Sequence, residues 1–265
     1  DLAPVSHVPE RPEGAARLQF AFAYAHQDRR AEGTTDPALV LGAMRLPFFL
    51  LLLADDLSRS FMPMFAAGLA VGPLNISANM VASLPIFAFM LVVALSQPVL
   101  GGWSERIGRR RSFLTGAALA CCAHLLSAQA STLLELLVWR AAGGAAWAIA
   151  FVAAQGYILD HTDSKTRTAG LAAFVGIIMV SLVCGPPIGG ILADGISHRA
   201  TLLVAAALTA VALALAWRRL PRDAATDPAS APQAKVASLN LGLAFTNRRF
   251  LILLLLTTIP TKIIL

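Results

Sequence analysis

The sequence contains few charged residues. Only 14% of its 265 residues are Asp, Glu, Lys or Arg, whereas about 25% is usual for a soluble domain. Hydrophobic residues make up 57% of the chain, and the mean hydropathy is +0.69. This composition excludes an ordinary soluble enzyme and favours a protein with several membrane spans.

Cysteine is also scarce, and the motifs of several enzyme classes are missing. The three cysteines lie in apolar stretches without the spacing of a disulfide framework or a zinc site. His124 follows Cys121 and Cys122, but they supply one helix face and no fourth ligand, so helix packing is the better interpretation. The sequence has no glycine-rich phosphate loop, nucleophile elbow or metalloprotease motif. We therefore expect a protein that is not an enzyme and that needs no metal or cofactor.

Long apolar stretches occupy most of the chain from residue 46 onward, with short polar breaks between them. A helix that crosses a bilayer needs about 20 mostly apolar residues, so these stretches predict an all-α polytopic membrane protein. Six complete spans and the truncated start of a seventh are expected at 46–66, 79–101, 112–130, 133–156, 168–193, 200–217 and 250–265.

Two polar segments flank this predicted six-helix bundle, which covers residues 46–217. Residues 1–45 contain acids, arginines and prolines but no signal-peptide pattern, and they are interpreted as a cytoplasmic segment or the end of an upstream domain. Residues 218–249 are rich in Ala, Pro, Asp and Arg and are interpreted as a cytoplasmic central linker. A further six-helix half is expected to follow in the whole protein.

Positive charge is concentrated in alternate breaks. The breaks after the second, fourth and sixth predicted spans contain twelve Lys and Arg residues, whereas those after the first, third and fifth contain only Arg199. Because cytoplasmic loops carry an excess of Lys and Arg, this asymmetry predicts a multi-pass protein of the plasma (inner) membrane with a cytoplasmic amino-terminal segment. The net charge of +6 is then a topology signal, and no nucleic-acid binding is expected.

A glycine-bounded, arginine-rich segment follows the second predicted span. Gly101 is expected to allow close helix contact, Gly108 to allow a tight turn, and Glu105 to pair with a neighbouring arginine. The order Gly-x-x-x-Glu-Arg-x-Gly-Arg-Arg resembles the signature loop of the major facilitator superfamily, which usually has Asp at the position of Glu105. The alternative is a plain cytoplasmic loop. The resemblance implies a gating role, through charge pairs, for Gly101, Glu105, Arg106, Gly108, Arg109 and Arg110.

The fifth predicted span contains a pattern of glycine and proline. Gly185 and Gly189 are four residues apart and so share a helix face that lets a neighbouring backbone approach closely, while Pro186 is expected to kink the helix. The pattern resembles the fifth-span motif of drug/proton antiporters in the same superfamily, and generic small-residue packing is the alternative. The matching positions are Gly176, Gly185, Pro186, Gly189 and Gly190.

Arg140 lies inside the fourth predicted span, where a charge costs about 2.5–3.5 kcal/mol on insertion scales and indicates function by default. Its context resembles the superfamily pattern R-x-x-Q-G, with Gly143 in place of the glutamine. The resemblance implies a role in proton coupling or substrate orientation. The alternatives are that Arg140 extends to the membrane surface or pairs with Glu135.

Asp55, Asp56 and Arg59 lie near the middle of the first predicted span. In a continuous helix Arg59 pairs best with Asp55, four residues away, which leaves Asp56 as the acid without a local partner. We therefore expect a site for coupling or binding at Asp55, Asp56 and Arg59, in which at least one of the two acids carries a proton or meets a cationic group. Asp56 is slightly favoured, and a structural ion pair is the alternative. By contrast, Asp160 and its neighbours in the break after the fourth span are expected to be solvated.

A short spacing pattern is repeated within the chain. Gly190, Asp194 and Arg199 have the same spacing as Gly101, Glu105 and Arg110 but fall on the opposite predicted membrane face. This is the pattern expected of a three-plus-three inverted repeat.

Together the resemblances imply the amino-terminal six-helix half of a major facilitator transporter and the start of its seventh helix. They imply alternating access and proton-coupled export. The expected partners are the lipid bilayer, a small-molecule substrate, protons and the carboxy-terminal half that this chain lacks. Two other functions remain open: a metabolite symporter or facilitator, and a sensor with the same fold coupled to an upstream domain.

Overall fold

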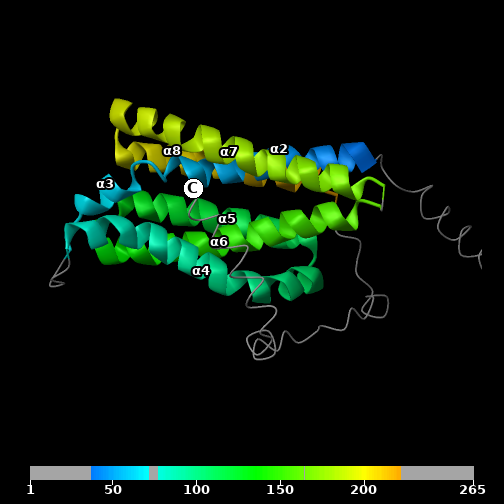
Figure 1. Cartoon of the computed structure of the whole chain (residues 1–265), viewed down its shortest axis with the longest axis horizontal. Coiled ribbons are helices and arrows are strands. Elements are labelled where there is room, and N and C mark those ends of the chain that lie inside the picture. The colour runs from blue at the N-terminus through cyan, green and yellow to red at the C-terminus, as the bar shows by residue number, and fades with distance from the viewer. Residues whose placement is uncertain (1–36, 72–76, 164, 222–265) are drawn as a thin grey trace, which may run out of the picture.

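The computed structural model describes residues 37–71, 77–163 and 165–221, and the regular elements in these residues are helices. Six long helices run along the long axis of the molecule, and the short α3 lies at one end (Figure 1). The helices are α2 (Pro37–Leu57), α3 (Met62–Ala67), α4 (Ala78–Ile107), α5 (Arg109–Gln129), α6 (Leu133–Asp160), α7 (Arg167–Gly195) and α8 (His198–Arg219). The predicted seventh span and nearly all of the predicted linker lie outside the described residues.

Five of the described helices are long and apolar enough to cross a membrane, namely α4 over Ala78–Gln97 and the whole of α5, α6, α7 and α8. They correspond to the second to sixth predicted spans, and each begins within three residues of its predicted start. The prediction of an all-α polytopic membrane protein is therefore confirmed.

The first predicted span is wrong as a single helix over 46–66. Helix α2 begins at Pro37 and ends at Leu57, and a turn separates it from α3. Two local features explain the break. The Ser58 hydroxyl donates a hydrogen bond to the Asp55 carbonyl, in competition with the helix backbone. Pro63 has no N–H group and fits the first turn of a new helix. Asp55 and Asp56 consequently lie in the last turn of α2.

Two chain reversals have clear local causes. Between α4 and α5 the chain turns at Gly108, whose φ of 102° is a conformation that side chains with a Cβ rarely adopt. At the start of α6, Thr132 Oγ1 accepts a hydrogen bond from Glu135 N, and the Glu135 carboxylate accepts from Thr132 N, which forms a capping box. Glu135 therefore caps the helix, and the structure shows no pair between Glu135 and Arg140.

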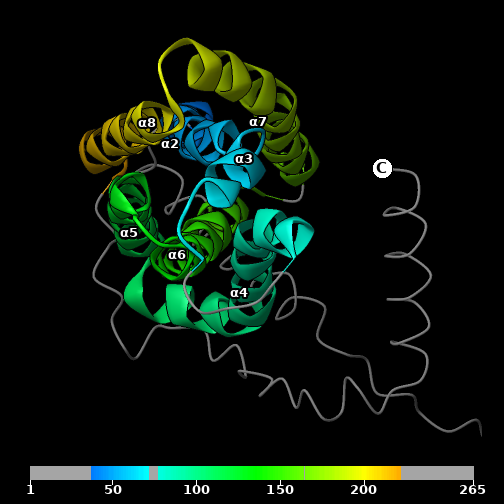
Figure 2. The same ribbon diagram turned by 90° about the vertical axis from the view of Figure 1, so that its left-hand side faces the viewer.

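The helices differ strongly in how much of their surface is buried. In α5 56% of the residues in the most apolar window are buried, compared with 22% in α4 and 17% in α7. Figure 2 shows α5 and α8 together on the left, whereas α7 and much of α4 lie towards the right. Among the five apolar helices, α4 and α7 are therefore the most exposed and α5 is the most buried.

Candidate functional site

Two acids at the end of α2 form a buried charged cluster with residues of α6, α7 and the turn after α2. Asp55 and Asp56 are 4% and 5% exposed, and Arg140 of α6 is 4% exposed. Arg140 Nη2 lies 3.6 Å from Asp55 Oδ1, and Arg59 Nε lies 2.7 Å from Asp56 Oδ1. The Ser181 hydroxyl of α7 donates a 2.6 Å hydrogen bond to Asp56 Oδ2.

These pairings reverse the one expected for a continuous helix. Arg59 contacts Asp56 closely and reaches only to 4.0 Å from Asp55. The reason is the break after Leu57, which takes Arg59 out of the helical register that favours a partner four residues away. Asp56 is therefore not the acid without a partner, and the main partner of Asp55 is Arg140, 85 residues further along the chain.

Two glycines of α7 allow α2 to come close enough to form this cluster. A Cβ atom added at Gly185 would overlap Asp56, and one added at Gly189 would overlap the backbone of Leu57. The close approach expected at these two positions is thus present. A Cβ at Gly176 would meet nothing within 4 Å among the described residues, and one at Gly190 would make ordinary contact with Ser60. Pro186 lies inside α7, which continues to Gly195.

The guanidinium of Arg140 also lies over an aromatic ring, with Cζ 4.7 Å from the ring centroid of Phe89 in α4. One helical turn after Arg140, a Cβ at Gly144 would overlap the backbone of Phe89. The close packing of α4 on α6 therefore places a ring face beside the buried cation. Such a contact is worth about 2 kcal/mol or more when the cation is desolvated.

His124 of α5 also lies in this region, although the sequence favours a role in helix packing for it. It is 3% exposed and interacts electrostatically with Asp55 and Arg140. His124 Nδ1, Asp55 Oδ2 and Arg140 Nε have no hydrogen-bond partner among the described residues. Buried polar atoms are rarely left unpaired, and those that are often mark a water or functional site. The sequence does contain a signal for His124, because an ionisable residue inside a predicted membrane span often has a functional role.

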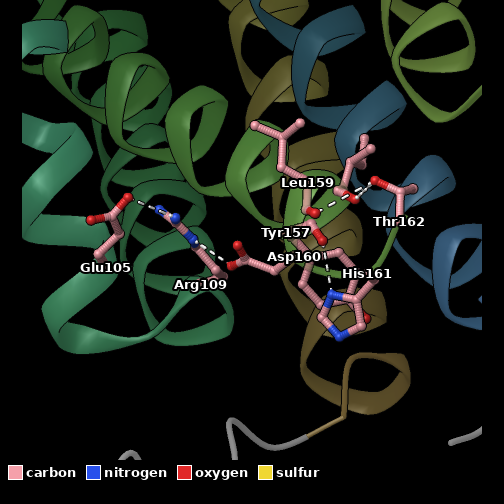
Figure 3. A network of polar contacts seen from close by, with 8 residues as sticks. Glu105, Arg109, Tyr157, Leu159, Asp160, His161 and Thr162 are labelled. Carbon is pink, nitrogen blue, oxygen red and sulfur yellow. Dashed lines mark hydrogen bonds and ion pairs between the residues drawn. The ribbon is translucent and has the colours of Figure 1, made fainter. Parts of the chain in front are cut away.

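A second charged network lies at the carboxyl end of α4 and joins this helix to α5 and α6 (Figure 3). Arg109 Nη2 lies 3.1 Å from Glu105 Oε1, and Arg109 Nε lies 2.9 Å from Asp160 Oδ2. The Arg109 side chain crosses Gly156, where an added Cβ would overlap the guanidinium. Sequence reasoning missed Asp160 because its partner is 51 residues away.

The residues around this network have different environments. Arg110 Nη2 donates a 2.7 Å hydrogen bond to the Trp217 carbonyl of α8, and Arg106 is exposed. A Cβ at Gly101 would meet nothing within 4 Å, so the close helix contact expected there is absent among the described residues. In the loop between α6 and α7, hydrogen bonds from the Thr166 hydroxyl and backbone N–H hold the pKa of Asp163 below its usual value.

The donor atoms described so far do not form a metal site. Over residues 37–71, 77–163 and 165–221, no group of three or more His, Cys, Asp or Glu side chains is arranged to hold a metal ion. What the arrangement offers is a set of buried, paired charges between helices that are long enough to span a bilayer. This combination is that of a polytopic membrane protein, in which charged residues inside spans mark functional positions.

Comparison with known proteins gives the family. The sequence profile of the Major Facilitator Superfamily matches residues 47–261, and the chain belongs to this superfamily. Among curated relatives, the class E tetracycline resistance protein of Escherichia coli is 34% identical over 54% of this chain and 34% of its own length. Multidrug resistance protein 1 of Bacillus subtilis is 28% identical over 51% of this chain and 35% of its own length.

A third relative, citrate exporter 1 of Aspergillus niger, is 31% identical over 55% of this chain and 25% of its own length. The matched segments thus cover well under half of the length of each of these relatives. The chain is a multi-pass membrane protein of a transporter superfamily, similar to members of the drug-efflux type, and it is not an enzyme.

Solved structures agree on the fold. The human organic anion transporter MFSD10 (TETRAN) superposes with a TM-score of 0.59 at 18% identity, covering 71% of this chain and 48% of that one. The peptide transporter POT in complex with sulfate superposes with a TM-score of 0.58 at 15% identity, covering 85% of this chain and 51% of that one. At such identities the likeness concerns the fold alone.

Proposed function

We propose that the whole protein is a secondary transporter that exports small solutes in exchange for protons by alternating access. The observation that carries this proposal is the cluster of buried Asp55, Asp56 and Arg140 with the partly exposed Arg59, in a chain with efflux relatives. Charges inside a span are costly and are retained where they carry ions or substrate. Protonation of an acid in this cluster releases its arginine partner, so it changes the contacts between α2 and its neighbours.

The network of Glu105, Arg109 and Asp160 is suited to gating. Its two acids are more than half exposed, so the ion pairs are formed and broken at small cost. In this proposal the pairs hold the ends of α4, α5 and α6 together in one state, with Arg106 and Arg110 beside them. The close contacts of Gly185 and Gly189 carry motion of α7 to the charged cluster.

The exposed faces of α4 and α7 support a second bundle as partner. These faces carry large apolar side chains over much of their length: Met80, Phe87, Met90, Leu95 and Val99 on α4, and Val175, Met179, Val183 and Ile191 on α7. In the whole protein they would face a second six-helix half, with the solute cavity between the halves.

A reciprocal contact supports the proposed inverted repeat. Arg110 near the start of α5 donates to the Trp217 carbonyl near the end of α8, and Arg199 near the start of α8 donates to the Ala130 carbonyl that follows α5. Two helices that exchange equivalent contacts are what a two-fold relation between three-helix units produces. We also propose that the protein lies in the plasma membrane with its amino-terminal segment on the cytoplasmic side, as the loop charges indicate.

Reconstitution of the whole protein into vesicles tests the proposal. Tetracycline and a panel of lipophilic cations are offered under an imposed pH gradient, while solute uptake and internal pH are followed together. Exchange predicts that solute accumulates as protons leave the vesicle. We expect Asp56→Asn to abolish this coupled flux in a protein that still inserts, whereas Asp163→Asn in the exposed loop should leave it unchanged.

Each other outcome decides against part of the proposal. Solute and protons that move in the same direction would establish symport, and solute movement without protons would establish a facilitator. Binding of solute without any flux would favour the sensor. Coupled flux that survives Asp56→Asn would remove Asp56 from the mechanism.

A further inference from the structure

An apolar groove runs between α5 and α8, two helices that lie together on the left in Figure 2. Its volume is about 500 Å³. The side chains that line it are Leu114, Thr115 and Ala118 of α5 and Ala210, Leu213, Ala214 and Trp217 of α8. Thr115 is the one polar side chain among them, and its hydroxyl donates to the Ser112 carbonyl of its own helix. The walls are therefore suited to a hydrocarbon chain.

The two helices that form the groove are antiparallel. Contacts follow one another along the pair from Arg110 and Trp217 at one end, through Cys121 Sγ and the Ala206 carbonyl, to Arg199 and the Ala130 carbonyl at the other. The start of α5 consequently lies beside the end of α8.

Where the start of α5 lies beside the end of α8, arginines adjoin the apolar residues of both walls of the groove. Residues four apart on a helix share a face. Arg110 and Arg111 precede Leu114 and Thr115 by four residues on α5, and Arg218 follows Ala214 by four residues on α8. Three arginines therefore lie one helical turn beyond the apolar lining. At the opposite end of the helix pair, in the described residues, Arg199 is the one arginine.

Trp217 marks the boundary between the apolar lining and the arginines. Its side chain lines the groove and is 65% exposed, and Arg110 Cζ lies 5.3 Å from its ring centroid. An indole ring at this position is typical of the interface between hydrocarbon and headgroups. The groove thus has the amphipathic order of a phospholipid, with an apolar body, an interfacial aromatic ring and a cationic end.

We propose that this groove binds an anionic phospholipid, with an acyl chain along α5 and α8 and the phosphate among Arg110, Arg111 and Arg218. Guanidinium groups bind phosphate with strong, charge-assisted hydrogen bonds. Basic pockets between helices on the cytoplasmic side attract anionic lipids, and the predicted topology places this end there. The site depends on the membrane location of the chain and on this orientation, but not on the transported solute or on proton coupling.

Thermal unfolding of the purified protein in a mild detergent tests the site. Phosphatidylglycerol and phosphatidylcholine with identical acyl chains are titrated separately. We expect phosphatidylglycerol to raise the Tm by about 5 °C at saturation, in the range that ligand binding to the folded state produces, and phosphatidylcholine to raise it much less. The double variant Arg111→Gln/Arg218→Gln should lose this difference.

A matched control separates the groove from general surface charge. Arg106→Gln/Arg167→Gln removes two exposed arginines of α4 and α7 from the same predicted side of the membrane. Neither lines the groove, so this variant should keep the difference between the lipids. Ala214→Phe fills the groove without changing charge and should weaken the response to phosphatidylglycerol. Glycerophosphoglycerol, which has the headgroup but no acyl chain, should leave the Tm unchanged.

The proposal is overturned if both lipids stabilise the protein equally, or if the groove double variant still prefers phosphatidylglycerol. It is also overturned if the control variant loses the preference to the same extent, since general electrostatics would then explain the effect. A response to glycerophosphoglycerol equal to that of the lipid would show a phosphate site without an acyl-chain groove.

Discussion

The charged cluster at the end of α2 and the network at the start of α5 use the same chemistry in opposite surroundings. In the cluster, the side chains of Asp55, Asp56 and Arg140 are 5–7% exposed. In the network, the acids that pair with Arg109 are 51% and 57% exposed. Water solvates the two acids of the network when a pair opens, whereas it reaches Asp55, Asp56 and Arg140 very little. The other two arginines are intermediate, with side chains 30% exposed at Arg59 and 14% exposed at Arg109.

The difference in solvation determines how much free energy it costs to break an ion pair in each site. An exposed pair contributes about 0–1 kcal/mol, which suits a contact that opens in every cycle of the proposed transport. Breaking a buried pair by removing one partner costs about 3–5 kcal/mol, because a buried charge is left uncompensated. A proton can relieve that cost, and for this reason we propose that the cluster serves coupling and the network serves gating.

The glycines beside the two sites show the same contrast. At Gly185 and Gly189 an added Cβ would overlap Asp56 and the backbone of Leu57, neither of which can move without shifting α2. At Gly156 it would overlap the end of the flexible Arg109 side chain. The buried site therefore depends on a fixed helix spacing, whereas the exposed one adapts.

The largest expected effect comes from Arg140→Gln, which leaves Asp55 buried without its main partner. We expect the free energy of unfolding in detergent to fall by about 3 kcal/mol or more. Adding Asp55→Asn should restore a large part of this loss, since neither charge is then left alone, and the double-mutant cycle measures the coupling. A double variant no more stable than Arg140→Gln would show that the pair is not coupled.

The next largest effect is expected from Gly189→Ala. Its Cβ overlaps the backbone of Leu57, and overpacking of this kind costs about 1–3 kcal/mol. Gly176→Ala in the same helix meets open space, so it should be neutral or slightly stabilising because alanine favours a helix. Gly156→Ala should fall between these two. Equal effects at Gly189 and Gly176, measured by the same unfolding assay, would contradict the close contact.

Effects of similar or smaller size, and of opposite sign, are expected at two buried polar groups near the cluster. Ser181→Ala removes a hydrogen bond to the Asp56 carboxylate and should lower the free energy of unfolding by about 1.5–3 kcal/mol. His124→Leu removes the unpaired Nδ1 atom and should raise it by about 1 kcal/mol. A destabilising His124→Leu would show that the imidazole makes a favourable interaction in its buried position.

The smallest effects are expected in the exposed network. Glu105→Gln and Asp160→Asn should each lower the free energy of unfolding by less than about 1 kcal/mol, and added salt should reduce the difference from the original protein. Arg109→Gln should cost more than either, because Arg109 joins both acids. If Glu105→Gln destabilised the protein as strongly as Arg140→Gln, the contrast between the two sites would not hold.

Prediction from sequence succeeded where the determining interactions are local. The second to sixth spans begin within three residues of their predicted positions, since hydropathy is a sum over neighbouring residues. The close approach at Gly185 and Gly189 also followed from helical spacing. The first span failed because Ser58 and Pro63 interrupt a stretch whose hydropathy alone indicates one helix.

Prediction failed where the partners are distant in the chain. Along the sequence Glu135 is an available partner for Arg140, but in the structure Glu135 caps α6 and Arg140 contacts Asp55. The position of Asp160 in a polar break predicts a solvated side chain, whereas in the structure it pairs with Arg109. No pattern along the sequence states which of several acids an arginine will reach, because that depends on how two helices lie against each other.

By itself, then, the sequence determined which segments are apolar enough to cross a membrane, which side carries the positive charge, and which superfamily the chain resembles. These properties are local sums or short motifs. Only the tertiary structure decided that Asp55 pairs with Arg140 and Asp56 with Arg59 and Ser181. The energy of an ion pair depends on distance and burial, and both are set by the packing of α2, α6 and α7.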